Sequence, residues 1–248
     1  MRVHDWIVPD WPAPPRVHAL VTTRAGGVSR GAYAGLNLSQ RSGDDLEAVT
    51  RNRARLRQWL PAEPRWLRQV HGTTVAEADT MEGSAEADAA IARRPGTVCA
   101  ALTADCLPLL LCDEQGTAVA AVHAGWRGLS SGVIEQTVRF MDRPPAQLLA
   151  YLGPAIGPAA FEVGAEVREA FVAAGQGGDA GAGAAFMPGK PRKFYADLYA
   201  LARQRLARSG VVRVYGGGYC TYTERERFYS YRRDGATGRM ASLVWMEN

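Results

Sequence analysis

The sequence contains few histidines and cysteines, which limits the metal chemistry it can support. Only four of each occur among 248 residues, and no two cysteines have the C-x-x-C spacing. A structural zinc knuckle is therefore not expected. The cysteines are also too few, and too deeply set in apolar sequence, to form the disulfide framework of a small secreted domain. We expect all four to be reduced.

Long apolar runs and a strong charge of one sign are also missing. No run approaches the roughly 20 apolar residues that span a bilayer, and the N-terminus lacks a basic region followed by an apolar core. We therefore expect a cytoplasmic protein without a membrane partner. The 29 basic and 25 acidic residues give a net charge of +4. This small excess suits small anionic substrates better than nucleic acid.

Two apolar runs near the middle of the chain each lie beside a residue that can do chemistry. The runs 107–112 and 117–123 are separated by the turn sequence DEQG and predict a β-hairpin. Cys106 precedes the first run, and His123 ends the second. If Cys112 pairs with Thr117 across the turn, the numbers of paired residues sum to 229. Cys106 and His123 then lie opposite one another at the open end of the hairpin. The prediction requires the two strands to be direct neighbours.

The remaining pattern predicts one large α/β domain over residues 1–248. The expected further strands are 17–23, 65–71, 98–102, 146–152, 211–215 and 240–246. The expected helices are 46–60, 133–141, 161–174 and 195–208. We expect loops at 124–128, with Ser130 or Ser131 capping the helix that follows, and at 175–185, where a glycine- and alanine-rich sequence indicates a mobile surface segment.

His71 ends the segment 65–71 and supplies a second imidazole beside Cys106 and His123. One thiolate and two imidazoles suit Zn²⁺ and leave a fourth tetrahedral position open. The same residues also permit a metal-free reading, in which His123 activates Cys106 as a nucleophile. Asp105 is a candidate for proton transfer or for orienting the site, although an aspartate in a turn explains it equally.

Three arginines lie beside glycine-containing turns. They are Arg24 before Gly26-Gly27, Arg127 within the sequence GWRG, and Arg232 before Gly235. Backbone N–H groups that converge at such turns, together with a guanidinium, can bind an anion. A surface arginine beside an ordinary turn is the competing interpretation.

Several ordered motifs give the chain a family resemblance. They are TTRAGGVS (22–29), LNLS (36–39), QVHG (69–72), ADCLP (104–108), HAGWRG (123–128), LGPAIGP (152–158), FEVG (161–164) and SYRRDGATGRMA (230–241). With these motifs the chain resembles the bacterial family called multicopper polyphenol oxidases or laccase-domain proteins. Members are also described as peptidoglycan-editing factors and as purine nucleoside phosphorylases.

The resemblance implies a mixed α/β fold of layered sheets flanked by helices, with His71, Cys106 and His123 as zinc ligands. It further implies phosphorolysis of adenosine, inosine and methylthioadenosine, with adenosine deamination as a second activity. Arg24, Arg127 and Arg232 would then hold phosphate, and the partners would be a purine nucleoside and phosphate. The resemblance also leaves open hydrolysis of an amide in a peptidoglycan precursor that carries a misincorporated residue.

Laccase chemistry is the least favoured of these activities. A multicopper oxidase needs several copper centres with mainly imidazole ligands, and four histidines can furnish only one centre. Cu²⁺ could still replace Zn²⁺ there, because copper outcompetes zinc at most nitrogen and sulfur sites. A purely structural zinc is also disfavoured, because three protein ligands leave the site open.

Overall fold

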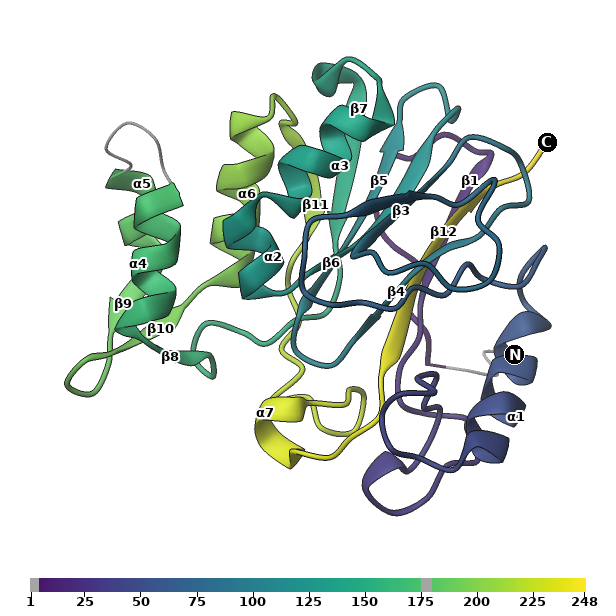
Figure 1. Cartoon of the computed structure of the whole chain (residues 1–248), viewed down its shortest axis with the longest axis horizontal. Helices are drawn as coiled ribbons and strands as arrows, with labels where there is room; N and C mark the ends of the chain where they lie inside the picture. Colours follow the sequence, from purple (N-terminus) through teal and green to yellow (C-terminus); the bar gives the residue numbers. More distant parts are fainter. Residues whose placement is uncertain (1–4, 175–179) are drawn as a thin grey trace.

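A six-stranded mixed sheet forms the centre of the fold (Figure 1). The computed structural model describes residues 5–174 and 180–248. In spatial order the strands are β11 (Arg213–Gly216), β7 (Leu148–Leu152), β5 (Leu107–Asp113), β6 (Val119–Ala124), β3 (Ala89–Ala92) and β2 (Val75–Glu77). The β11–β7 and β2–β3 pairs are parallel, and the pairs between them are antiparallel.

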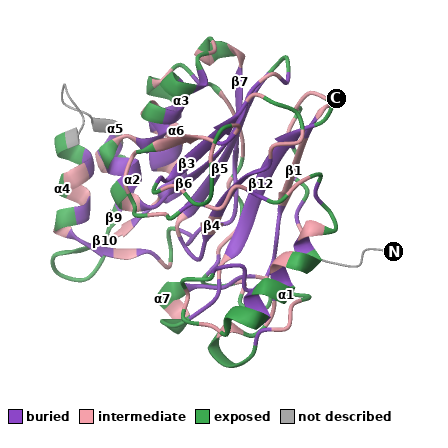
Figure 2. Cartoon of the chain, turned by 45° about the vertical axis from the view of Figure 1, so that its right-hand side comes forward, coloured by how far each residue is buried: buried purple, intermediate pink, exposed green. Residues whose placement is uncertain are grey.

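Strand β5 shows why the centre of the sequence is so apolar. Its odd-numbered leucines, such as Leu109 and Leu111, pack with the helices, whereas Leu110 and Cys112 pack toward a second sheet. Successive side chains of a strand point to opposite faces, so a strand covered on both faces is apolar at every position. The buried strands at the middle of Figure 2 show this double covering.

The second sheet is antiparallel and packs on one face of the central sheet. Its order is β1 (Val17–Val21), β12 (Met240–Met246) and β4 (Cys99–Thr103). The outer face of this sheet is covered by α1 (Leu46–Arg57), whose Leu56 packs near Leu243. Asp45 caps α1 by accepting a hydrogen bond from the backbone N–H of Glu47.

Helices cover the opposite face of the central sheet (Figure 1). They are α2 (Trp126–Ser131), α3 (Val133–Met141) and α6 (Leu198–Arg208). A small third sheet, in the order β8 (Glu162–Gly164), β10 (Lys193–Ala196) and β9 (Phe186–Pro188), lies beside α4 (Ala165–Ala174) and α5 (Ala180–Ala184). The short segments η1 (Gly31–Tyr33), η2 (Pro145–Gln147) and α7 (Tyr231–Asp234) complete the described elements. The predicted α/β fold of layered mixed sheets flanked by helices is confirmed.

The predicted hairpin is present, but its register differs from the prediction. Strands β5 and β6 are direct antiparallel neighbours in which Pro108 faces His123, so paired residue numbers sum to 231 rather than 229. The carboxylate of Asp113 accepts hydrogen bonds from the backbone N–H groups of Thr117 and Ala118, which keeps both residues in the turn. The shift is two residues, so Cys106 and His123 remain at the same open end.

Other predicted elements were wrong in part. Residues 65–71 form isolated bridges at Arg65 and Arg68 in place of a strand. The predicted loop 124–128 contains the start of α2, and Gly132, in a left-handed conformation at φ 97°, takes the place of a serine cap before α3.

The predicted helices 161–174 and 195–208 begin later, because their first residues belong to β8 and β10. Of the predicted loop 175–185, residues 175–179 lie outside the described residues, and Ala180–Ala184 form α5. None of the described helices has the length and apolar character needed to cross a bilayer.

Candidate metal centre

His71, Cys106 and His123 come together at the open end of the β5–β6 hairpin. Their ligand atoms all lie within 4.8 Å of one another. The Cys106 Sγ is 3.7 Å from His71 Nε2, and the two imidazole rings are 4.7 Å apart between centroids. A tetrahedral zinc with ordinary bond lengths would hold its sulfur and nitrogen ligands about 3.6 Å apart. The donor set and its spacing therefore fit Zn²⁺.

Asp88, which the sequence did not single out, holds both histidines in place. Its carboxylate is fully buried and accepts a hydrogen bond from His123 Nδ1 at 2.8 Å. This contact directs Nε2 of His123 toward the other two ligands. The same carboxylate accepts backbone N–H groups from Val70, His71 and Gly72 at 3.2, 2.9 and 2.6 Å. A buried carboxylate immediately before the apolar strand β3 was the signal available in the sequence.

The backbone around His71 is held from two sides. The amide of Gln69 donates to the carbonyl of Leu102 and accepts its N–H, both at 2.8 Å, so the side chain replaces a strand partner. His71 itself has φ 62°, in the left-handed region that a non-glycine residue adopts only at a cost. The contacts from Gln69 and Asp88 maintain this conformation.

The electrostatics of the metal-free centre favour an ion pair. Burial opposes ionisation of the Cys106 thiol, but the charge and hydrogen bonds of His123 and His71 outweigh it and lower the pKa to about 6. Burial likewise disfavours the His123 imidazolium, but Cys106 and Asp88 raise its pKa to about 9. Burial would raise the pKa of Asp88, yet hydrogen bonds from His123, Gly72 and Val70 lower it.

Asp105 connects the metal centre to α7. Its carboxylate accepts the Thr221 hydroxyl and the backbone N–H of Arg232, each at 2.6 Å. Asp105 also has φ 91°, although it is not glycine. Both carboxylate oxygens of Asp105 accept hydrogen bonds, and its backbone is strained. Because Asp105 precedes Cys106 in the chain, these contacts fix the position of Arg232 relative to Cys106.

The metal centre opens into a cavity of about 610 Å³. Trp126, Phe161 and Tyr231 provide aromatic surface in its lining, and Arg127 lies over the ring of Trp126 at 4.4 Å. Arg232 donates to the carbonyl of Glu162 at 2.7 Å. The structure therefore places Asp105, Arg127 and Arg232 in the lining of the cavity that the metal donors share.

Arg24 is placed elsewhere. It is not among the residues that line the cavity, and its guanidinium donates to the carbonyls of Arg225 and Ala34. Two arginines that sequence reasoning did not select, Arg41 and Arg239, line the cavity in its stead. They are 198 positions apart in the chain, so the local sequence gave no sign that both line one cavity.

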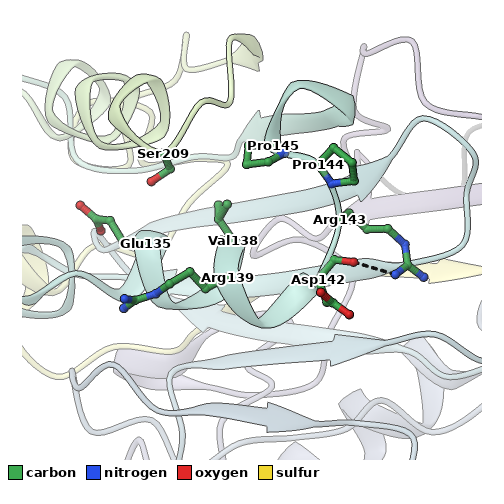
Figure 3. A pocket seen from close by; sticks show the side chains of 8 residues that line it. All are labelled: Glu135, Val138, Arg139, Asp142, Arg143, Pro144, Pro145 and Ser209. Carbon is green, nitrogen blue, oxygen red and sulfur yellow. Dashed lines mark hydrogen bonds between the residues drawn. The ribbon is translucent and has the colours of Figure 1, made fainter.

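A separate hollow lies beside α3 and the segment that follows it, next to the end of α6 (Figure 3). It is lined by Glu135, Val138, Arg139, Asp142, Arg143, Pro144, Pro145 and Ser209. Its residues include no histidine or cysteine, and Arg143 there donates to the Asp142 carbonyl. Among the residues that the structure describes, only His71, Cys106 and His123 form a group of three metal donors that include histidine or cysteine.

Comparison with known proteins identifies the family of this chain. The family model for multicopper polyphenol oxidoreductase laccase matches residues 18–247. The chain belongs to this family. It is 55% identical over 247 residues to a Pseudomonas aeruginosa protein named purine nucleoside phosphorylase, covering 99% of this chain and 100% of that one. The similarly named Escherichia coli protein YfiH is 54% identical over 243 residues, covering 97% of this chain and 98% of that one.

Solved structures of family members have the same fold. The Neisseria meningitidis protein NMB0706 matches with a TM-score of 0.93 and 51% identity, over 98% of this chain and 100% of that one. YlmD from Geobacillus stearothermophilus matches with a TM-score of 0.90 and 28% identity, over 100% and 98% of the two chains. The predicted family resemblance is thus confirmed.

Proposed function

We propose that this protein is a zinc-containing purine nucleoside phosphorylase acting on adenosine, inosine and methylthioadenosine in the cytoplasm, with adenosine deamination as a second activity. One observation carries the proposal: a metal-donor triad and the guanidinium groups of Arg127 and Arg232 share a cavity of about 610 Å³. That volume is in the range of small-molecule sites. The names of the 54–55% identical relatives support the same activity.

Phosphorolysis requires the cavity to bind two molecules side by side. A phosphate oxygen attacks C1′ of the ribose, and the bond from C1′ to the purine nitrogen breaks. The bonding electrons leave with the purine, which takes up a proton, and ribose 1-phosphate forms. In this proposal Arg127 and Arg232, which line the cavity, hold the phosphate, because guanidinium groups bind it through paired hydrogen bonds. Trp126 and Phe161 offer faces on which a purine can stack.

The remaining roles follow from the contacts of the centre. His71, Cys106 and His123 would hold the zinc, which when bound supplies a Lewis acid that can activate water for deamination. Asp105 acts as a positioning residue, since its carboxylate holds the backbone of Arg232 next to Cys106. Copper could occupy the same donors, but the described residues offer no further centre of the kind that laccase chemistry needs.

The decisive assay incubates zinc-loaded protein with inosine, with and without phosphate. Hypoxanthine that forms only with phosphate supports the proposal, and ammonia release from adenosine tests the second activity. A peptidoglycan precursor carrying a misincorporated residue is assayed in parallel. Release of an amino acid from that precursor, with no cleavage of inosine, would favour amide hydrolysis and overturn the proposal.

Arg127→Ala tests the phosphate site directly. Loss of one charge-assisted contact should raise the phosphate concentration needed for half-maximal rate by about ten-fold or more. The matched control is Arg51→Ala, an exposed arginine on α1 outside the cavity. An unchanged phosphate dependence in Arg127→Ala would remove this residue from the site.

A further inference from the structure

The cavity contains more positive charge than one phosphate requires. Arg41, Arg127, Arg232 and Arg239 all line it, and the only acidic residue in the lining is Asp105. Asp105 is already engaged by Thr221 and by a backbone N–H. Among the described residues, no carboxylate lies within ion-pair distance of any of the four guanidinium groups. Unpaired cations in a concave site raise the local concentration of anions.

The four arginines come from two structural groups. Arg127 belongs to α2 and lies on Trp126, and Arg232 reaches the carbonyl of Glu162 on β8. Arg41 and Arg239 come from a different pair of neighbouring segments.

Backbone and side-chain contacts join those two segments. The N–H of Arg239 donates to the Asn37 side chain at 2.9 Å, and the N–H of Leu38 donates to the Arg239 carbonyl at 3.3 Å. The loop that begins at Leu38 then carries Arg41 into the cavity lining. Arg41 and Arg239 therefore belong to one part of the cavity lining, which is formed by other segments than those of Arg127 and Arg232.

Hydrogen bonds orient the Arg239 side chain before any ligand binds. Its Nη1 donates to the carbonyls of Thr237 and Gly238 at 2.8 and 2.9 Å, which orients the guanidinium. Arg239 lines the same cavity as Asp105 and Cys106. Burial lowers the pKa of Arg239, and the charges of Cys106 and Asp105 oppose that shift. An oriented, partly buried guanidinium loses little entropy when it binds an anion.

We propose that Arg41 and Arg239 form a second anion subsite that binds a phosphate group carried by the nucleoside itself. The inference rests on the proposed function, in which Arg127 and Arg232 bind the free phosphate. A purine nucleoside 5′-monophosphate is a simple ligand that combines a purine nucleoside with an anionic group, and it serves here as the probe. The cavity thus binds such a nucleotide more tightly than the parent nucleoside.

The test compares binding of inosine and inosine 5′-monophosphate to the zinc-loaded protein by calorimetry without free phosphate. In the wild type the nucleotide should have a dissociation constant about ten-fold lower, the effect of one charge-assisted hydrogen bond. Arg41→Ala, at an exposed position, should reduce this ratio. Arg239→Lys, which keeps the charge but loses the planar fork, should reduce it too. Arg51→Ala on α1 is the control and should preserve the ratio.

Two results would overturn the inference. One is equal affinity of the wild type for nucleoside and nucleotide. The other is a nucleotide preference that survives Arg41→Ala and Arg239→Lys but disappears in Arg127→Ala, which would assign the extra phosphate to the first subsite. Phosphate-dependent formation of hypoxanthine is measured separately. If that reaction is absent while the preference depends on Arg41, the subsite stands and the proposed phosphorylase activity fails.

Discussion

Asp88 shows how much of the metal centre depends on a residue that is not a ligand. Its carboxylate orients the His123 ring and binds three successive backbone N–H groups that include that of His71. An amide in its place would present an N–H₂ group to donors that need an acceptor. Replacing such an outer partner of a ligand histidine commonly lowers metal affinity by about 10–100-fold.

We therefore expect Asp88→Asn to weaken zinc binding by about 10–100-fold, as measured by competition with a chromophoric chelator. The d–d spectrum of the cobalt-substituted protein should change as well, because the ligands are misoriented. The matched control is Asp113→Asn, another buried carboxylate that accepts backbone N–H groups, at the far end of the hairpin. Equal loss of zinc affinity in both variants would show a general structural effect and contradict the assigned role.

Cys106 should differ sharply in reactivity from Cys99 and Cys112. None of the four cysteines is in a disulfide. Burial raises the pKa of Cys99 well above its ordinary value and that of Cys112 to about 12, so both remain thiols in the folded protein. The pKa of Cys106, at about 6, makes it a thiolate at neutral pH when no metal is bound.

Alkylation of the metal-free protein should thus modify Cys106 at pH 7.5 long before Cys99 and Cys112. Because its pKa is lowered, the rate at Cys106 should fall as the pH drops through about 6. Zinc added beforehand should protect it, since the metal occupies the sulfur. Peptide mass spectrometry measures each site. Fast alkylation of Cys106 in the zinc-loaded protein would exclude it as a ligand.

At the scale of elements, the hairpin was predictable because its signals are local. Apolar runs and the DEQG turn lie within about 20 residues of sequence, and they define which strands pair. The register was not predictable in the same way, because the Asp113 side chain binds the N–H groups of Thr117 and Ala118 and lengthens the turn. The even shift preserved the face on which Cys106 and His123 lie.

The prediction of a strand at residues 65–71 was wrong because the hydrogen-bond partners that hold this segment are distant in the sequence. Gln69 binds Leu102, 33 positions away, and His71 binds Asp88, 17 positions away. No local pattern reveals such contacts. The ligand role of His71 remains a prediction, which rests on family motifs and on a donor chemistry that does not depend on local secondary structure.

The junction between β6 and α2 offers a test at this scale. A Cβ added at Gly125 would lie 2.9 Å from Cys106 Sγ and from His71 Cδ2, closer than real contacts allow. Gly125→Ala should displace both ligands and reduce zinc affinity by about ten-fold or more, measured by chelator competition. In Gly218→Ala the added Cβ meets nothing within 4 Å, so this control should bind zinc normally. Normal zinc binding by Gly125→Ala would place the metal elsewhere.

Across the whole molecule, the sequence predicted the layers better than the cavity. Each buried face of a sheet requires apolar residues at every second position of its strands, and this pattern is visible in the sequence, as in the leucines of β5. The cavity is assembled from segments as far as about 200 residues apart, such as those of Arg41 and Arg239, and each contributes only a few polar side chains. Arg24 and Arg41 both follow the first strand within 20 residues, yet only Arg41 lines the cavity.

The three metal donors also tie distant segments together, so zinc should stabilise the whole fold. His71 precedes β2, Cys106 precedes β5 and His123 lies in β6. A ligand that binds only the folded state at 100 times its dissociation constant adds about 2.7 kcal/mol, which for a domain of this size raises Tm by about 5–10 °C. Calorimetry with and without a chelator measures the shift. His71→Ala should abolish it, whereas His18→Ala, which removes an imidazole stacked on Trp245, should retain it. A Tm that is insensitive to the chelator in the wild type would contradict a zinc that links these segments, because binding to the folded state alone must raise Tm.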